Sequence, residues 1–377
     1  MTAPHPDAPM DPAPPAAPPA PPPAPPTRRP RWPVIFAVLV GLAIVIILAA
    51  TFVRLPYVIY SPGEATPVEG IVKIDGARTY RSPGEVLFLT VAVSRGRPNV
   101  WRWIQASLDD DSQVVGETHY LGGQSRKHVD QENVVAMDDS QLAAKKVALE
   151  QLGYTVSLTG SGAIVAQVLK GSPADGHLKV GDVITAINGE PVRTAEDVGT
   201  IVRAQPIGTT FVFTVTRDDK TLSESITTVE GQSGVLVGKP QVGIAPLTKD
   251  LKVDLPVQVT IDPGPVSGPS AGLAFTLTII DEMTPGSLTG GKKVAVTGTM
   301  GLDGKVGEVG GVPQKTAAAL DAGAKLFIVP KPEVHDAKAR AGSSATVIGV
   351  STIEGALKAL RDHGGAPVVK IGTAAAA

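Results

Sequence analysis

Ser270 lies between a predicted strand and a predicted helix, in the segment Asp262-Pro-Gly-Pro-Val-Ser-Gly-Pro-Ser-Ala-Gly272. The first turn of a helix has backbone N–H groups without intrahelical acceptors and is the positive end of the helix dipole. A serine there can attack a carbonyl carbon while nearby amides, here those of Gly268, Ser270 and Ala271, bind the resulting oxyanion. A serine at a helix start is also a common cap, so this feature alone leaves both interpretations open.

Lys315 lies in the first turn of another predicted helix, which begins at Pro313 and is otherwise apolar and rich in alanine. The positive end of the helix dipole disfavours an ammonium group, and so does burial. A lysine in such a place can be neutral near pH 7 and act as a general base. Most lysines are solvated surface charges, so Lys315 by itself also allows two interpretations.

Together the two segments resemble the signature motifs of the Lon peptidase family. The family motif GPSAG, followed by an apolar helix, is matched by Gly268-Pro-Ser-Ala-Gly-Leu-Ala-Phe275. The family motif TGxxxxxGxVxxVGGxxxKxxAAxxAG is matched position by position from Thr297 to Gly323, and a strand follows at 325–330. Ser267 and Asp303 depart from the family, which often has an acidic residue and an arginine at these positions.

The resemblance covers residues 255–360 and implies a Ser–Lys dyad. In it, Ser270 is the nucleophile, Lys315 is the base and Thr297 is a hydrogen-bond partner of the lysine. The resemblance also implies a homo-oligomeric ring, expected to be a hexamer. The segment from Gly298 to Val306 has the wrong spacing for a phosphate-binding loop, and Val306 replaces the required Ser or Thr, so we expect no use of ATP and no cofactor.

Residues 153–230 resemble a PDZ domain, on the motif GSPADGHLKVGDVITAINGEPV. PDZ domains bind C-terminal peptides by strand addition, and the backbone amides of a glycine-containing loop bind the peptide carboxylate. By resemblance, that peptide-binding loop is Leu152-Gly153-Tyr154. The alternative is a PDZ fold that serves only as a spacer.

Other kinds of active site fit the sequence less well. GPSAG also fits the G-x-S-x-G turn of α/β-hydrolases, which would need His335 or His363 as its histidine, but neither lies in a catalytic-looking motif. The six histidines are scattered without H-E-x-x-H, so we expect no metal site. Cysteine is absent, which excludes thiol catalysis and disulfides.

A membrane anchor is predicted near the N-terminus. Residues 1–33 form a Pro-rich tail, expected to be disordered, and Val34 to Val53 contain no charge over 20 residues, enough to span a bilayer core. Three arginines precede the apolar run, which predicts a cytoplasmic N-terminus and an extracytoplasmic location for all that follows: Arg28, Arg29 and Arg31. A cleaved signal peptide is the alternative, although the run is long and no clear cleavage site follows.

The remaining residues, 54–377, are predicted to have an α+β fold that consists of a Lon-like catalytic domain with an inserted PDZ domain. We expect residues 54–150 and 235–363 to form the catalytic unit, residues 151–232 to form the PDZ domain, and residues 364–377 to form a flexible tail. Within this plan, Gly116 to Asn133 is expected to be a loop and Asp138–Leu152 a helix.

The sequence thus predicts a membrane-anchored serine endopeptidase that cleaves envelope or secreted proteins without ATP, of the PDZ-containing YlbL type. A net charge of −2 gives no basic surface for nucleic acid. The alternative is a non-catalytic PDZ adaptor of the cell envelope with a degenerate Lon-like domain.

Overall fold

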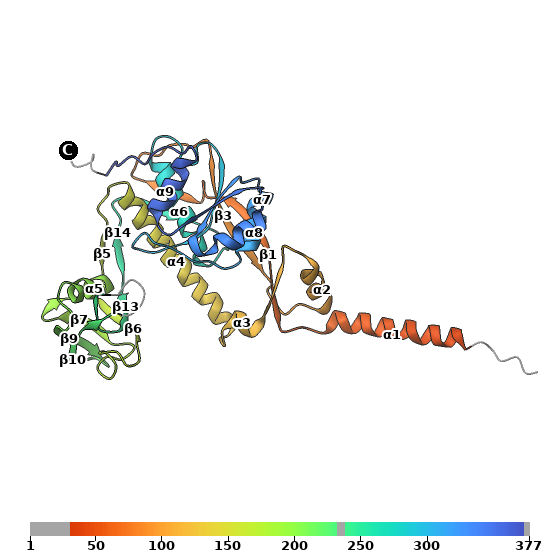
Figure 1. The fold of residues 1–377 in the computed structure, drawn as a ribbon, viewed down its shortest axis with the longest axis horizontal. Coiled ribbons are helices and arrows are strands. Elements are labelled where there is room, and N and C mark those ends of the chain that lie inside the picture. Colours follow the sequence, from red (N-terminus) through yellow and green to blue (C-terminus); the bar gives the residue numbers. More distant parts are fainter. Residues whose placement is uncertain (1–30, 232–237, 373–377) are drawn as a thin grey trace, which may run out of the picture. The chain divides into compact units, whose positions relative to one another are not determined.

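The computed structural model describes residues 31–231 and 238–372 (Figure 1). The expected Pro-rich tail therefore lies outside the described residues except for its last three positions, as do the last five residues of the expected C-terminal tail. The chain divides into two units, Met1–Val53 and Arg54–Ala377. Each unit is described by itself.

The described part of the first unit is the helix α1, Trp32–Phe52. Its side chains are almost all apolar, and its length of 21 residues is enough to cross a membrane. Proline lies in its first turn, where the missing N–H has no cost.

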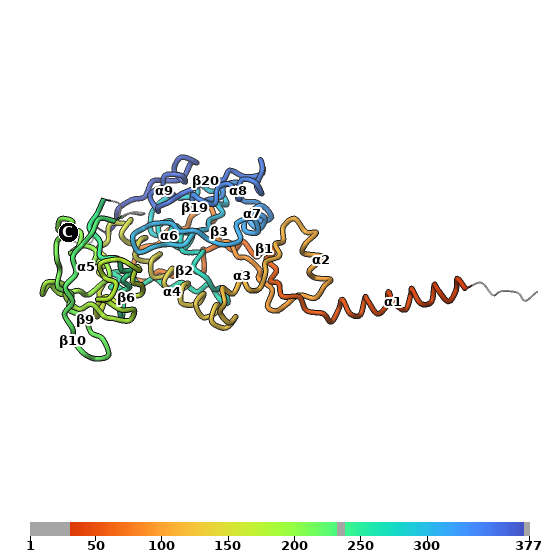
Figure 2. Tube along the Cα trace, turned by 60° about the horizontal axis from the view of Figure 1, so that its bottom comes forward, coloured from red at the N-terminus to blue at the C-terminus, as the bar shows by residue number. Residues whose placement is uncertain are grey.

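The larger unit is built around a six-stranded mixed sheet in the order β20-β19-β16-β3-β1-β4. Four of these strands are parallel: β3 (Glu85–Val93), β16 (Lys293–Val296), β19 (Leu326–Pro330) and β20 (Thr346–Val350). Two antiparallel strands complete the sheet: β1 (Tyr57–Pro67) and β4 (Gln113–Gly116). Because β3 pairs with β16, segments about 200 residues apart in the sequence form one sheet. Figure 2 labels two of its strands, β3 and β19, in the same part of this unit.

Helices cover both faces of this sheet, so its central strands are buried on both sides. Val86 and Phe88 of β3 pack in the core with three helices: α4 (Arg126–Gln151), α6 (Gly272–Met283) and α9 (Ile353–Asp362). Leu87 and Leu89, which point to the other face, pack with two helices: α7 (Val312–Asp321) and α8 (Val334–Ala341). Alternate residues of one strand thus enter two cores, as the two-residue period of a strand requires.

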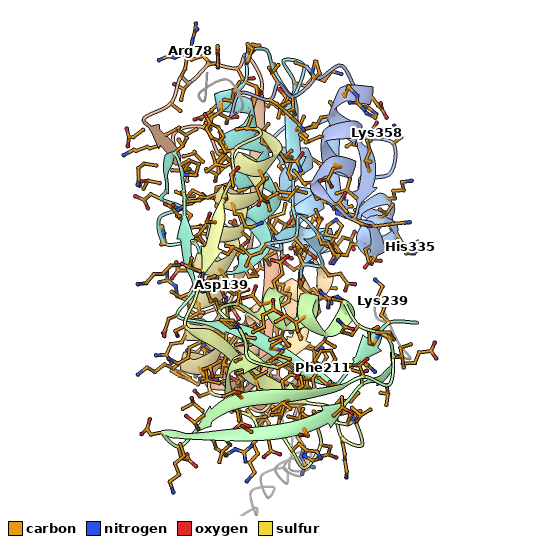
Figure 3. The ribbon with its side chains drawn as sticks, turned by 90° about the vertical axis from the view of Figure 1, so that its left-hand side faces the viewer. Arg78, Asp139, Phe211, Lys239, His335 and Lys358 are labelled. Atoms are coloured by element: carbon orange, nitrogen blue, oxygen red, sulfur yellow. The ribbon has the colours of Figure 1, made fainter. Side chains whose placement is uncertain are left out.

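A second sheet forms a separate core in the order β10-β9-β7-β6-β13. Its strands are β6 (Gly162–Val168), β7 (Val183–Ile187), β9 (Thr210–Arg217), β10 (Lys220–Thr227) and β13 (Ile244–Lys249), with β8 (Glu190–Pro191) paired to β7. The helix α5 (Ala195–Arg203) begins with a capping box at Thr194 and Asp197. Phe211, labelled in Figure 3, is 1% exposed in this core.

Short elements complete the fold. The helices are α2 (Val100–Leu108) and α3 (Glu117–Leu121), with 3₁₀ turns η2 (Pro269–Ala271) and η3 (Lys331–Glu333). Four two-stranded ribbons pair β2 (Val72–Asp75) with β15 (Gln258–Ile261), β5 (Ser157–Thr159) with β14 (Lys252–Asp254), β11 (Val229–Glu230) with β12 (Pro240–Gln241), and β17 (Thr299–Met300) with β18 (Val306–Gly307).

The mixed α+β fold predicted from the sequence is confirmed, but one local prediction is wrong. The expected loop at 116–133 contains α3 and the first turns of α4, which begins after the cap Ser125. This stretch is polar because it is largely exposed, and it has no apolar periodicity to reveal a helix. The boundary predicted at 232–235 stays a prediction; β13, which follows it, pairs with β6 as the last strand of the second sheet.

Candidate active site

Ser270 lies in the 3₁₀ turn η2, immediately before α6. Gly268 has φ +96°, a conformation that favours glycine, and its N–H donates to the carbonyl of Asn133 at 3.0 Å. Ser140 Oγ donates to the carbonyl of Pro269 at 2.8 Å. At Gly272, a Cβ atom would lie 2.2 Å from Ser140 Oγ, so α4 packs against the turn too closely for any side chain there. The two glycines and α4 therefore determine where Ser270 lies.

The carbonyl of Ser270 is held by the strand end that follows β16. It accepts a bond from the N–H of Gly298 at 2.9 Å and one from Thr297 Oγ1 at 3.3 Å. Thr297 is fully buried, and its own N–H donates to the carbonyl of Ile328 in β19. The serine turn is thus fastened to the central sheet.

Lys315 is 3% exposed and lies in the first turn of α7. Its Nζ donates to Thr297 Oγ1 at 3.0 Å. Burial lowers the pKa of this lysine from 10.5 to about 7, and the nearby charge of Glu333 partly opposes that shift. A substantial fraction of Lys315 is therefore neutral at neutral pH, as a general base requires.

Glu333, in η3, is the charged neighbour of this lysine. Its Oε1 accepts from the N–H of Val309 at 2.6 Å, at the start of the turn that leads through Gly311 into α7. Its Oε2 is buried without a hydrogen-bond partner among the described residues. Burial is the main cause that raises the pKa of Glu333. Glu333 thus fixes the backbone before α7 and tunes the charge of Lys315.

Ser270 and Lys315 both line one cleft of about 980 Å³. Residues at the end of β3, the first turns of α4 and the Gly310–Gly311 turn form its other walls. The hydrogen bonds of the described residues do not include one between Ser270 Oγ and Lys315 Nζ. The two predicted groups thus share a cleft, linked through Thr297.

Of the three backbone amides expected to bind an oxyanion, one already donates a hydrogen bond within the protein. That of Gly268 is engaged with Asn133. Those of Ser270 and Ala271 lie in the turn at the start of α6, where N–H groups have no intrahelical acceptor, and they stay candidates.

The residues predicted to form the peptide-binding loop lie at the end of α4, beside the core of the first sheet. Leu152 is fully buried in the core of the first sheet, and its carbonyl accepts from the N–H groups of Ile371 and Gly372. Gly153, at φ +88°, and Tyr154 follow it at the end of α4. The loop was placed by the short Leu-Gly-Tyr pattern, which here ends a helix.

An edge of the second sheet is a better candidate for peptide binding. In the described residues β13 is the last strand of that sheet, next to α5, whose Ala195 N–H donates to Thr248 Oγ1 at 2.9 Å. Gly243, directly before β13, has φ +85°. The strand therefore has one unpaired edge, a helix beside it and a glycine turn at its start.

The histidines considered for other chemistry lie outside the cleft. His335 is exposed on α8 (Figure 3), and His363 Nδ1 lies 2.8 Å from the carbonyl of Ala359. Among the described residues, no three His, Asp or Glu side chains are grouped as metal ligands.

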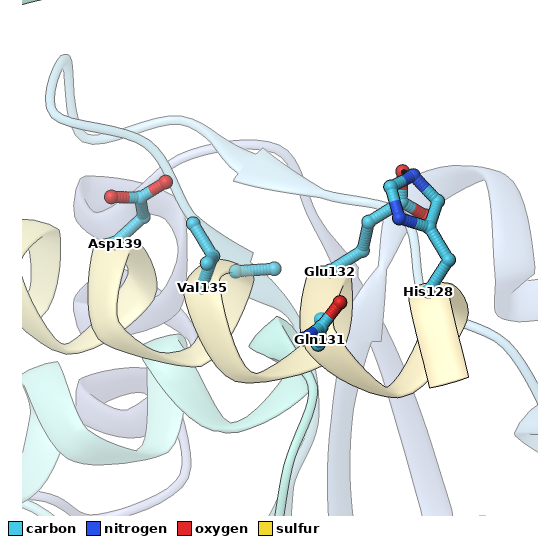
Figure 4. A pocket seen from close by; sticks show the side chains of 6 residues that line it. His128, Gln131, Glu132, Val135 and Asp139 are labelled. Carbon is cyan, nitrogen blue, oxygen red and sulfur yellow. Dashed lines mark ion pairs between the residues drawn. The ribbon is translucent and has the colours of Figure 1, made fainter. Parts of the chain in front are cut away.

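A separate depression follows a single face of α4 (Figure 4). Within it, His128 Nε2 lies 3.4 Å from Glu132 Oε1, and both side chains are largely exposed. Because all its residues come from one helix, it brings together no groups from different elements.

Family models match two parts of the chain. Residues 230–360 match the Lon protease (S16) C-terminal proteolytic domain. Residues 150–228 match the PDZ domain. The expected order, a PDZ domain followed by a Lon-type serine peptidase domain, is thereby confirmed.

Individual relatives are similar over shorter stretches. The Lon protease of Rhizobium meliloti is 38% identical over 94 residues, which is 25% of this chain and 11% of the relative. That of Azospirillum brasilense is 34% identical over 110 residues, 28% of this chain and 13% of the relative. The chain thus spans little more than a tenth of these relatives. The solved PDZ domain of an SdrC-like protein from Listeria innocua is 26% identical, with a TM-score of 0.21, over 22% of this chain and 92% of that one.

Sequence reasoning missed three residues that position the site. Asn133 and Ser140 hold the serine turn from α4, and Glu333 holds the turn before Lys315. The first two act through hydrogen bonds to backbone atoms distant in the sequence, which leave no local pattern. Glu333 could have been noticed only as an acidic residue directly after a buried strand.

Proposed function

We propose that this chain is a serine endopeptidase that cleaves protein substrates without ATP through Ser270 and Lys315. The observation that carries this proposal is the buried Lys315, with a pKa of about 7, hydrogen-bonded to Thr297 in the cleft that Ser270 lines. Among the described residues, Lys315 has no carboxylate within hydrogen-bonding distance, so its burial lowers stability, and lysines with such a perturbed pKa are concentrated at functional sites.

The donors and acceptors around Lys315 leave the lone pair of its neutral amine free. Lys315 donates to Thr297 Oγ1, and Thr297 donates to the Ser270 carbonyl, so the lone pair of the neutral amine stays available. As Ser270 Oγ bonds to the peptide carbonyl carbon, its proton moves to Lys315 and the carbonyl electron pair moves to oxygen. The oxyanion then reforms the carbonyl as the C–N bond breaks, and Lys315 gives its proton to the departing amine, which leaves an ester on Ser270. Water, deprotonated by Lys315, hydrolyses the ester and restores Ser270.

The direct test uses the full chain, an unfolded protein substrate and no ATP. We expect cleavage by the native chain, loss of cleavage in Ser270→Ala, and normal cleavage in Ser343→Ala, which changes an exposed serine on a distant turn. Full retention of a cellular phenotype by Ser270→Ala, with no cleavage by either form, would support the non-catalytic adaptor instead.

We propose that the PDZ domain binds extended C-terminal tails of substrates at the unpaired edge of β13. Strand addition satisfies the exposed backbone groups of such an edge. The turn at Gly243 would provide the amides for the terminal carboxylate, in place of the loop at Leu152.

We further propose that the PDZ domain is an insertion in the catalytic unit, since β3 pairs with β16 across it.

The helix α1 would anchor the chain with its N-terminus in the cytoplasm, as the preceding arginines favour. A cysteine at exposed Gln124 should then react with an impermeant reagent in intact cells; protection of this position would reverse the orientation. A homo-oligomeric ring, expected to be a hexamer, and substrates among envelope or secreted proteins belong to the same proposal.

A further inference from the structure

The helix α2 has apolar side chains on two opposite sides. On one side Ala106 is buried, and the ring of Trp103 lies 6.2 Å from that of Tyr57 in β1. On the other, Trp101, Ile104 and Leu108 are 45%, 36% and 80% exposed. Their spacing of three and seven residues puts these three side chains on one face of the helix. We call them the α2 outer face.

The start of α2 is fixed beside the residues that follow α1. The N–H of Leu55 donates to the carbonyl of Pro98 at 2.9 Å, and Arg54 forms a β-bridge with Asn99, the cap of α2. The apolar helix α1 ends at Phe52. Two residues span at most about 7 Å of extended chain, so covalent connection alone keeps α2 close to the end of α1.

We propose that the α2 outer face lies in the lipid–water interface of the membrane that α1 crosses. This inference rests on the membrane anchor of the proposed function and adds a second contact with the same membrane. Tryptophan is enriched at this interface, and an amphipathic helix there buries its apolar side at the boundary of headgroups and acyl chains.

The charges near this face fit anionic headgroups at its first turn. Arg54 and Arg102 are exposed there, and neither forms an ion pair with another described residue. Asp109 follows the last turn, but its carboxylate accepts from Ser112 Oγ and the N–H of Asp111, which keeps it within its own turn. Juxtamembrane arginines are attracted to anionic lipid surfaces.

A second contact would restrict the orientation of the catalytic unit. The inner side of α2 packs on β1 and β4, which belong to the same sheet as β16. A single helix and a short link would let this sheet rotate freely above the membrane, whereas the α2 outer face would hold it in one orientation.

The test measures fluorescence of the full chain in vesicles of phosphatidylcholine and phosphatidylglycerol. Trp32→Phe and Trp103→Phe leave Trp101 as the single tryptophan of the chain. Quenching by lipids with a nitroxide near the headgroup is compared with quenching by iodide in the water. In a matched control, all three tryptophans become Phe and Leu169→Trp places a single tryptophan at an exposed position directly after β6 of the second sheet. In another, they become Phe and Phe36→Trp reports on α1.

We expect Trp101 to be quenched by the nitroxide lipid, shielded from iodide and blue-shifted in emission, with the Leu169→Trp control showing the reverse. Quenching of Trp101 by iodide alone would overturn the proposal. So would shielding from both quenchers, which would indicate that a second copy covers this face. Loss of lipid quenching at Phe36→Trp would overturn the anchor and the proposal with it, whereas cleavage by Ser270 is measured separately and is unaffected by either result.

Discussion

Lys315 Nζ donates a 3.0 Å hydrogen bond to Thr297 Oγ1, and that hydroxyl donates onward to the carbonyl of Ser270. One buried threonine therefore connects the proposed base with the backbone of the proposed nucleophile. The connection depends on the strand end after β16 and on the first turn of α7, two elements that the chain brings together only by folding.

Lys315 should destabilise the folded protein. Its pKa is lowered from 10.5 to about 7, so protonation is disfavoured in the folded state by roughly 5 kcal/mol relative to the unfolded chain. The penalty is complete below pH 7, decreases as pH rises toward 10.5 and is absent above that. Lys315→Met should therefore raise the melting temperature at pH 7 while it abolishes cleavage. Calorimetry at pH 7 and pH 10 checks this, and a lower melting temperature at pH 7 would contradict burial as the cause of the shift.

Thr297 should matter through its hydroxyl. Thr297→Val removes the acceptor for Lys315 and leaves a buried amine without a partner, which costs about 1–3 kcal/mol. We expect a similar free energy to be lost from the transition state, which lowers kcat by roughly 5- to 150-fold and leaves KM little changed. Thr297→Ser keeps the hydroxyl and should retain most of the activity. An equal loss in Thr297→Ser, which lacks only the methyl group, would show that the hydroxyl alone does not account for the effect.

Glu333 should set the pH at which activity appears. Its negative charge raises the pKa of Lys315, so Glu333→Gln should lower that pKa and move the acidic limb of the kcat profile to lower pH. Glutamine still offers an oxygen to the Val309 N–H, which separates charge from structure. A profile that keeps its midpoint but loses height would mean that Glu333 only supports the turn.

The second sheet can be removed at a point that the structure defines. Thr159 and Lys252 are paired in the β5–β14 ribbon, so replacing residues 160–251 by Asn-Gly closes an ordinary hairpin. This variant should cleave short peptides near the native rate but lose its preference for proteins with accessible C-terminal tails. Equal loss for both substrates would show that the PDZ domain is a structural part of the catalytic unit.

The parts of the site that can be predicted from the sequence are those whose residues lie close together along the chain. Ser270, Lys315 and Thr297 lie in contiguous motifs rich in glycine, and Gly268 has a local reason to be glycine in its positive φ. Those residues were accessible to motif and helix-start arguments. The lowered pKa of Lys315 can be predicted only in part, because burial depends on packing from segments distant in the sequence.

What the sequence did not reveal depends on long-range pairing. The strand β13 lies beyond the PDZ motif and joins its sheet only through β6. The first turns of α4 are polar on most sides, so Asn133 gave no sign that its carbonyl holds Gly268. The Leu-Gly-Tyr pattern predicts a binding loop as readily as a helix end, because three residues cannot distinguish a helix terminus from a carboxylate-binding turn.

The central claim is covalent catalysis by Ser270 with Lys315 as base. The full chain is incubated with a peptide ester and no ATP. The reaction is quenched at short times, and the protein is digested for mass spectrometry. An acyl group should appear on the peptide that contains Ser270, faster as pH rises through about 7, and be absent in Ser270→Ala. In Lys315→Arg its formation should fall by about 10²- to 10⁴-fold, since a guanidinium stays protonated. An acyl group on another residue, or undiminished acylation in Lys315→Arg, would contradict the account.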